Sequence, residues 1–201
     1  MLNSTQNKIN FLFLFILLFT GCSSEESNPT RTDFGIFSVV NETTIEMDGV
    51  INSSSLRNFN ALIENYPEVN LINIFEVDGS DDDDINLLLS KRVHDLNIST
   101  QLVDNGLIAS GGVDFFLAGV RRTKGTNTLI GVHSWSDGVN EATDFPVGDV
   151  NHLPYIDYYT SVGFSQQEAE DFYYFTINAA PAADIHWMTE SEISEYGILK
   201  P

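Results

Sequence analysis

Apolar residues recur along this chain with two different periods, which predicts an alternation of strands and helices. Runs rich in β-branched and aromatic residues predict strands over 34–40, 43–48, 69–77, 98–103 and 128–133. Apolar residues spaced three or four apart predict helices over 53–65 and 81–96, the first with Leu56, Phe59 and Leu62 on one face. This alternation is typical of an α/β fold with a parallel or mixed sheet.

Polar and charged residues support the ends of the predicted helices. Asp81–Asp84 begin the helix over 81–96, and the basic residues near its end suit the helix dipole. Ser165 with Glu168, and Thr189 with Glu192, match the capping box and predict two later helices. We expect a glycine-rich turn to lead into 110–119, and the aromatic segment 150–163 to be helical in part.

The first 21 residues have the pattern of a targeting segment. Lys8 precedes an apolar run over 9–19, which is shorter than the about 20 residues that span a bilayer and suits the core of a signal peptide. The run ends in Phe19-Thr20-Gly21-Cys22, which resembles the lipobox of bacterial lipoproteins. An ordinary signal peptide followed by a chance cysteine is the alternative interpretation.

This resemblance implies a particular organisation of the chain. We expect a lipoprotein signal peptide over 1–21, a flexible tether over 22–32 and one domain over 33–201. Cys22 would carry thioether and amide lipids, such as palmitate, that anchor the protein to the membrane by acyl burial. The protein would then lie in the bacterial cell envelope, on the periplasmic or the surface face of a membrane.

Composition and charge narrow the classes of function. The chain has 29 acidic and 9 basic residues and a formal net charge of −20, which argues against nucleic acid as a partner. Its single cysteine excludes an internal disulfide and a cysteine-based zinc site. The histidines lack metal-ligand spacing and no phosphate-binding loop is found, so we expect neither a metal nor another cofactor.

Two residues carry the candidate chemistry. Ser110 lies between a predicted strand and a predicted helix, where the turn exposes the hydroxyl and the helix start offers N–H groups to an oxyanion. His133 ends the strand over 128–133 and is a candidate general base for Ser110. Each residue also has a purely structural interpretation, Ser110 as a helix cap and His133 as a satisfied strand-end residue.

The order of these segments resembles the proteolytic subunit of Clp protease and the ClpP/crotonase fold. The resemblance covers about residues 42–200 and rests on Asp78-Gly79, on Ala109-Ser110-Gly111, on Ile130-Gly-Val-His133 and on the closing Glu195-Tyr196-Gly197. It implies repeated ββα units that form a mixed or parallel sheet flanked by helices. In that family a serine attacks a peptide carbonyl and a histidine serves as its base.

The resemblance also implies roles for other residues. The amides of Gly79 and Gly111 would form the oxyanion hole, and Asp184 would orient His133, with Asp157 and Asp171 as rivals. Three departures stand out. Asp78 and Asp81–Asp84 lie where negative charge opposes an oxyanion, the segment between Ser165 and Asp184 is longer than in the family, and Trp135 with the 138–148 loop follows the histidine. The acidic run also alternates like a calcium loop, but it lacks the glycine and glutamate of the EF-hand.

The sequence therefore predicts a membrane-anchored, extracytoplasmic serine hydrolase, with peptides or proteins as its substrates. The alternative is a binding or scaffold lipoprotein on the same fold that has lost catalysis, which the acidic oxyanion region favours. A lysine base is disfavoured, because only Lys124 and Lys200 follow Ser110. The resemblance to this fold also implies a homo-oligomer.

Overall fold

The computed structural model describes residues 32–201. The predicted signal peptide, Cys22 and all but the last residue of the predicted tether lie outside the described residues. Within 32–201, no helix combines the length and the apolar character that a membrane crossing requires.

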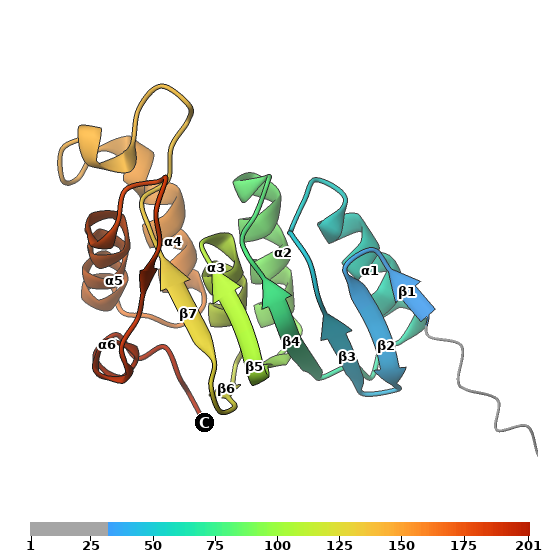
Figure 1. Ribbon diagram of the computed structural model, residues 1–201. Helices are drawn as coiled ribbons and strands as arrows, with labels where there is room; N and C mark the ends of the chain where they lie inside the picture. The colour runs from blue at the N-terminus through green and yellow to red at the C-terminus, as the bar shows by residue number, and fades with distance from the viewer. Residues whose placement is uncertain (1–31) are drawn as a thin grey trace, which may run out of the picture. The chain divides into compact units, whose positions relative to one another are not determined.

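An eight-stranded mixed sheet forms the centre of the fold (Figure 1). Neighbouring strands follow the order β1-β2-β3-β4-β5-β7-β8, and β6 pairs with β5 beside this path. The strands are β1 (Thr32–Phe34), β2 (Phe37–Asn41), β3 (Thr44–Met47), β4 (Leu71–Val77), β5 (Ser99–Ala109), β6 (Arg122–Lys124), β7 (Leu129–Val132) and β8 (His186–Trp187). Strands β3, β4, β5 and β7 run parallel, whereas β1, β2 and β8 pair antiparallel with their neighbours. The mixed α/β architecture predicted from the sequence is therefore confirmed.

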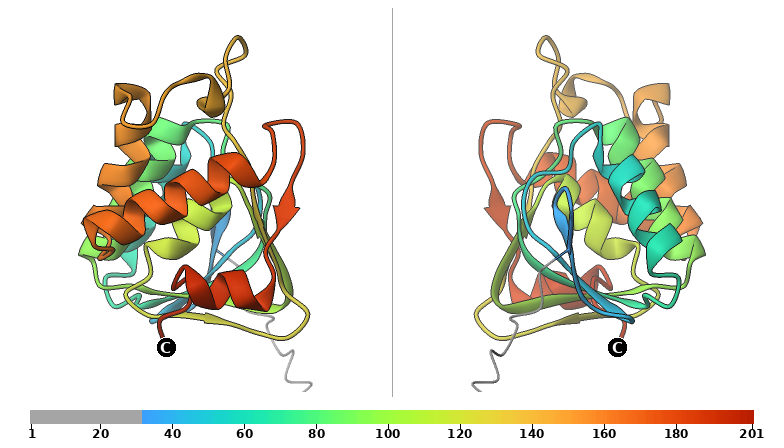
Figure 2. Two further views of the ribbon diagram at one scale, coloured as in Figure 1. Left: turned by 90° about the vertical axis from the view of Figure 1, so that its left-hand side faces the viewer. Right: turned by 90° about the vertical axis from the view of Figure 1, so that its right-hand side faces the viewer.

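Helices cover the sheet, and Figure 2 shows α1, α2 and α4 along the same face of it. The helices are α1 (Ser55–Asn65), α2 (Asp83–Asp95), α3 (Gly111–Leu117), α4 (Leu153–Ser161), α5 (Gln166–Ala179) and α6 (Glu190–Glu195), with short 3-10 turns η1 (Ala142–Asp144) and η2 (Val150–His152). Helix α2 packs against α1, α3 and α4, and α4 packs against α5. The core between these layers is aromatic and aliphatic, with Phe37, Phe59, Phe115 and Phe116 fully buried.

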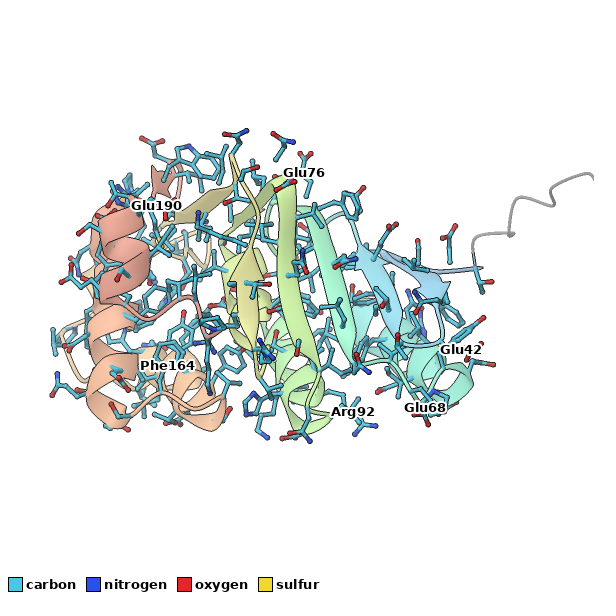
Figure 3. All side chains as sticks on the ribbon, turned by 90° about the horizontal axis from the view of Figure 1, so that it is seen from below. Glu42, Glu68, Glu76, Arg92, Phe164 and Glu190 are labelled. Carbon is cyan, nitrogen blue, oxygen red and sulfur yellow. The ribbon has the colours of Figure 1, made fainter. Side chains whose placement is uncertain are left out.

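The predicted capping signals explain where the helices begin. The side chain of Asp82 accepts a hydrogen bond from the Ile85 amide at the start of α2. Both predicted capping boxes are formed, by Ser165 and Glu168 before α5 and by Thr189 and Glu192 before α6. The acidic surplus is carried largely outside the core, and Glu42, Glu68 and Glu190 in Figure 3 are all exposed.

Strand β5 differs from the expectation of a turn before Ser110, because it continues as a strand to Ala109. Its first half pairs with β6 and its second half with β7, so the strand changes partner near Asn105 and Gly106. Asn105 has a φ of 61°, and a Cβ on Gly106 would lie 2.9 Å from the carbonyl oxygen of Val103. Gly106 therefore permits a close backbone contact at an irregular point within β5. It does not form a turn that reverses the chain.

Arg122 ties the C-terminal segment to the centre of the molecule. Its side chain is 4% exposed, and Nε donates to the Ile198 carbonyl at 2.7 Å while the terminal nitrogens donate to the carbonyls of Leu117, Gly119 and Gly197. The guanidinium also lies 5.5 Å from the centre of the Phe164 ring. Burial lowers the pKa of Arg122, and the four carbonyls supply the polar partners that a buried cation requires.

We expect Arg122→Met to destabilise the fold, since it leaves buried carbonyls without donors. The free energy of unfolding should fall by about 3 kcal/mol in urea titrations followed by circular dichroism. Arg121→Met is the matched control, because Arg121 is the exposed neighbour, and its stability should remain near that of the wild type. Equal stability of the two variants would contradict the role of Arg122 as a tie.

Candidate active site

Three adjacent parallel strands deliver the candidate residues to one edge of the sheet. Gly79 follows β4, Ser110 follows β5 and His133 follows β7. The register aligns Val77 with Ile108 and Ile108 with Ile130, so these three strands end nearly level. Because the carboxyl ends of parallel strands meet at one edge, residues separated by up to 54 positions in the sequence converge there.

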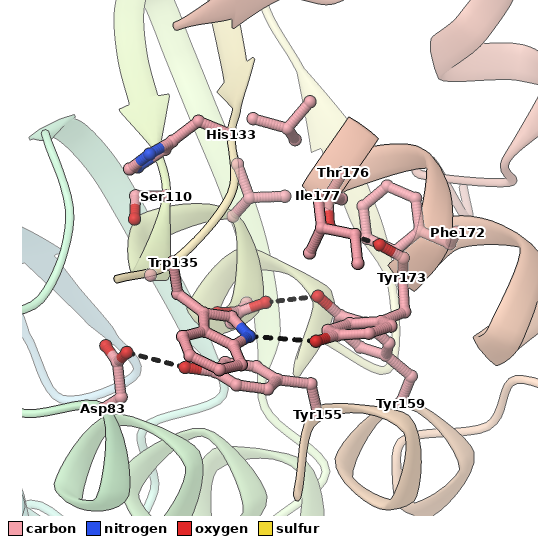
Figure 4. A pocket seen from close by; sticks show the side chains of 14 residues that line it. Asp83, Ser110, His133, Trp135, Tyr155, Tyr159, Phe172, Tyr173, Thr176 and Ile177 are labelled. Carbon is pink, nitrogen blue, oxygen red and sulfur yellow. Dashed lines mark hydrogen bonds between the residues drawn. The ribbon is translucent and has the colours of Figure 1, made fainter. Parts of the chain in front are cut away.

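Ser110 occupies a tight turn between β5 and α3. Its backbone has φ 50° and ψ −128°, and its amide still donates to the Gly131 carbonyl at 3.0 Å. A positive φ is costly for a residue with a side chain, and such strained positions cluster at functional sites. The hydroxyl does not cap α3, and among the described residues it makes no hydrogen bond. The structure thus places a free hydroxyl in the lining of a pocket, which Ser110 shares with His133 (Figure 4).

The two predicted oxyanion-hole residues lie beside Ser110. A Cβ on Gly79 would lie 3.3 Å from the Ser110 Cβ and 3.7 Å from its Oγ, so the Gly79 backbone lies beside the Ser110 side chain. Gly111 is the first residue of α3, where amides have no partner within the helix. Neither amide donates a hydrogen bond within the described residues; Gly111 lines the pocket, whereas Gly79 is buried beside Ser110.

His133 is half-buried, and its Nδ1 is sealed from solvent with no hydrogen-bond partner among the described residues. Asp184 is exposed, and its Oδ1 accepts the amide of Ile185 rather than a hydrogen from His133. The rivals are engaged elsewhere or point outwards: Asp171 accepts from Gln167, and Asp157 is exposed on α4. The orienting role of Asp184 therefore stays a prediction that no hydrogen bond in the structure supports.

The acidic residues Asp78 and Asp81–Asp84 have different surroundings. Some lie at the start of α2, and one lines the pocket. Asp82 caps α2, and Asp78, Asp81 and Asp84 are exposed or lie in its first turn. Asp83 alone among them lines the pocket, where its Oδ2 accepts from the Tyr155 hydroxyl at 2.7 Å and its Oδ1 accepts from Ser80. Within residues 32–201, no three histidine, cysteine or acidic side chains gather as a metal site would require.

Aromatic side chains from α4, α5 and the segment after β7 wall the pocket (Figure 4). Trp135 lies there, with its Nε1 donating to the Tyr173 hydroxyl at 2.9 Å, and that hydroxyl lies 2.7 Å from Nδ1 of the fully buried His152. Nε2 of His152 in turn lies 3.2 Å from the Pro146 carbonyl. This chain of contacts joins the loop after His133 to α5 and holds the wall of the pocket.

Asp114 is a pocket residue that the sequence patterns did not reveal. It lies on α3, one turn after Ser110, it is 8% exposed, and its Oδ1 accepts from the Tyr159 hydroxyl at 2.7 Å. Burial, with a further contribution from the negative charge of Asp83, raises the pKa of Asp114 to about 7, against the lowering effect of the Tyr159 hydrogen bond. The available signal was a single carboxyl within an otherwise apolar run, Val113 to Leu117.

Lys124 is remote from this site. It lies on β6, opposite Leu102 in the first half of β5, and its Nζ pairs with Glu190 at 2.7 Å. Ser110 follows the other end of β5, so Lys124 is not placed to act as its base.

Comparison with solved structures identifies the fold. A single-residue mutant of ClpP1 from Listeria monocytogenes aligns with a TM-score of 0.50 and 18% sequence identity, covering 79% of this chain and 89% of that chain. A serine-to-alanine mutant of the 1510-N membrane-bound stomatin-specific protease aligns with the same TM-score and identity, covering 78% of this chain and 76% of that chain. No family model matches the sequence, and no curated protein matches it either. The chain has a ClpP-like fold, as the sequence motifs indicated.

The raised pKa of Asp114 gives stability a specific pH dependence. The folded-state pKa of about 7 lies above the ordinary 3.8, so ionisation of Asp114 destabilises the fold increasingly as the pH rises toward 7. Asp114→Asn keeps an acceptor for Tyr159 but cannot ionise. Between pH 5 and 8 the unfolding free energy of the wild type should fall by about 2–3 kcal/mol relative to this variant, measured by urea titration.

A matched control separates this effect from the general charge of the molecule. Asp157→Asn removes an exposed carboxyl from α4 and should keep the pH dependence of the wild type. If Asp114→Asn and Asp157→Asn follow the same curve, Asp114 is not the group responsible.

Proposed function

We propose that this protein is a serine hydrolase that acts on peptides or proteins. The observation that carries the proposal is that Ser110, Gly111 and His133 line one pocket at neighbouring strand ends, with Gly79 beside Ser110. The ClpP-like fold supports the same function, since one of the two aligned structures is named as a mutant of a stomatin-specific protease.

In this proposal each group has one chemical task. Ser110 attacks the substrate carbonyl while His133 takes the hydroxyl proton and later passes it to the leaving group. The amides of Gly79 and Gly111 donate to the oxyanion that forms on the carbonyl oxygen. Water then releases the acyl group from Ser110 with His133 again acting as the base.

A non-catalytic binding protein on the same fold is the second candidate. The partnerless Nδ1 of His133 favours it, because a catalytic histidine usually has its other nitrogen held by an acceptor. Asp83, with its carboxylate on the pocket, also opposes the development of negative charge near Ser110.

An active-site-directed fluorophosphonate probe separates the two candidates. The wild type should become covalently labelled, and Ser110→Ala should lose labelling completely. His133→Ala should reduce the labelling rate by about 10²–10⁴-fold, because the general base contributes that much to nucleophilic attack. Intact-protein mass spectrometry reads the adduct directly, and circular dichroism checks that each variant is folded.

Ser161→Ala is the control for nonspecific reaction with hydroxyls, since Ser161 is exposed at the end of α4. It should label as the wild type does. A folded wild type that stays unlabelled between pH 6 and 9 would favour the binding protein instead.

We also propose that the protein is anchored in the cell envelope through lipids on Cys22, and that it forms a homo-oligomer there. The lipobox-like segment that ends in Cys22 supports the anchor. The acidic surface, with its net charge of −20, would not bind an anionic bilayer by itself, so the acyl chains would supply the attachment.

Cys22→Ala should therefore shift the protein from the membrane pellet to the soluble fraction after fractionation. The expected change follows from the loss of buried acyl chains, each methylene of which contributes about 0.8 kcal/mol. Metabolic labelling with an alkyne fatty acid should mark the wild type only. Membrane retention of Cys22→Ala would refute the lipid anchor.

A further inference from the structure

We propose that the pocket beside Ser110 binds an unbranched, positively charged substrate side chain of the lysine type, and that Asp114 is the carboxylate that recognises it. The inference rests on the proposed function of Ser110, because it assigns the side chain next to the bond that Ser110 attacks. It concerns residues that the proposed catalytic steps do not use.

Asp114 is placed as a buried recognition group. It is 8% exposed, yet it lines the pocket together with Ser110, Gly111 and His133. Its Oδ1 accepts from Tyr159, and its other carboxyl oxygen accepts no hydrogen bond from the described residues. That oxygen is not sealed in the interior, because Thr128 Oγ1 and His133 Nδ1 are the sealed side-chain atoms without partners in residues 32–201. The second oxygen of this buried carboxyl, on a residue that lines the pocket, is therefore left to accept a hydrogen bond from an occupant.

A second carboxylate and aromatic faces complete a site suited to a cation. Asp83 lines the same pocket from α2, and Tyr155, Tyr159 and Trp135 form its walls. Aromatic faces attract ammonium groups, most strongly when water is excluded. Two acidic side chains, Asp83 and Asp114, and one histidine, His133, line the pocket, so acidic groups outnumber basic ones where a positively charged side chain would bind.

The size of the pocket favours a narrow occupant. It encloses about 40 Å³. A cavity of this size has space for more than a single water, and it favours the narrow end of an unbranched side chain over a bulky one. A branched or aromatic side chain would require Trp135 or Tyr155 to move. An apolar side chain of the right width would fit, but it would leave the open oxygen of Asp114 buried without a partner.

Paired phosphonate probes test the recognition directly on the full-length chain. Two peptidyl diphenyl phosphonates would differ only at the residue next to the reactive phosphorus, lysine in one and norleucine in the other. These side chains share their methylene chain and differ by an ammonium in place of a methyl group. The wild type should react at least about tenfold faster with the lysine probe, because a paired charge in a desolvated pocket contributes that much.

The variants assign this preference to Asp114. In Asp114→Asn the lysine-to-norleucine ratio of labelling rates should fall to near one, while Asp83→Asn should lower the ratio by a smaller factor. Asp157→Asn, which changes an exposed carboxyl, should keep the ratio of the wild type. Equal rates for the two probes in the wild type, or an unchanged ratio in Asp114→Asn, would overturn the inference.

A binding measurement distinguishes failure of this inference from failure of the proposed function. In Ser110→Ala, which cannot react, about 50 mM n-butylammonium chloride should raise the melting temperature above that in equal sodium chloride, and n-butanol should not. The double variant with Asp114→Asn should lose this response. If fluorophosphonate fails to label the wild type but the ammonium response persists, the hydrolase proposal falls and the cation site stands. If labelling succeeds without the ammonium response, the cation site falls and the hydrolase stands.

Discussion

The register between three parallel strands fixes where Gly79, Ser110 and His133 lie. Val77, Ile108 and Ile130 are aligned across β4, β5 and β7, so the chain leaves each strand at nearly the same level. A shift of one residue between two of these strands would turn alternate side chains to the other face of the sheet. It would also separate Gly79 from Ser110, which now lie so close that a Cβ on Gly79 would touch the Ser110 side chain. The chemistry thus depends on strand register before it depends on any side chain.

The acidic side chains of the molecule lie in two different environments, which the net charge alone does not distinguish. Most acidic side chains are exposed or begin helices, where water and the helix dipole stabilise them, as at Asp82. Asp114 also lies in the first turn of a helix, α3, but it is withdrawn from water among apolar residues and has one tyrosine as its side-chain donor. Burying a carboxyl in this way costs stability, and the cost is concentrated beside the candidate nucleophile. Such an arrangement is typical of a site that a ligand completes.

Local patterns predicted much of this structure, and they failed where distant segments meet. Periodicity and capping residues are properties of a few neighbouring positions, so α1, α2, β4 and both capping boxes were predicted close to their observed bounds. Strand β8 has two residues and exists only because β7 lies beside it, so no local pattern marks it. The order of Gly79, Ser110 and His133 carried enough information to predict their convergence. Asp114 was missed because its meaning comes from Tyr159 on another helix, and the Asp184 assignment depended on a loop whose path the sequence does not specify.

The hydrogen bonds that join Trp135, Tyr173, His152 and Pro146 all have a defined donor and acceptor. Nε1 of Trp135 can only donate, so the Tyr173 oxygen accepts from it and its own hydrogen is free to point toward Nδ1 of His152. The Pro146 carbonyl can only accept, so Nε2 of His152 carries the hydrogen that faces it. The hydrogen bonds therefore all run in one direction, from Trp135 through Tyr173 and His152 to the Pro146 carbonyl. The Tyr173 hydroxyl links Trp135, which lines the pocket, to His152 and through it to the loop at Pro146. A movement of Trp135 would therefore break hydrogen bonds that also hold this loop.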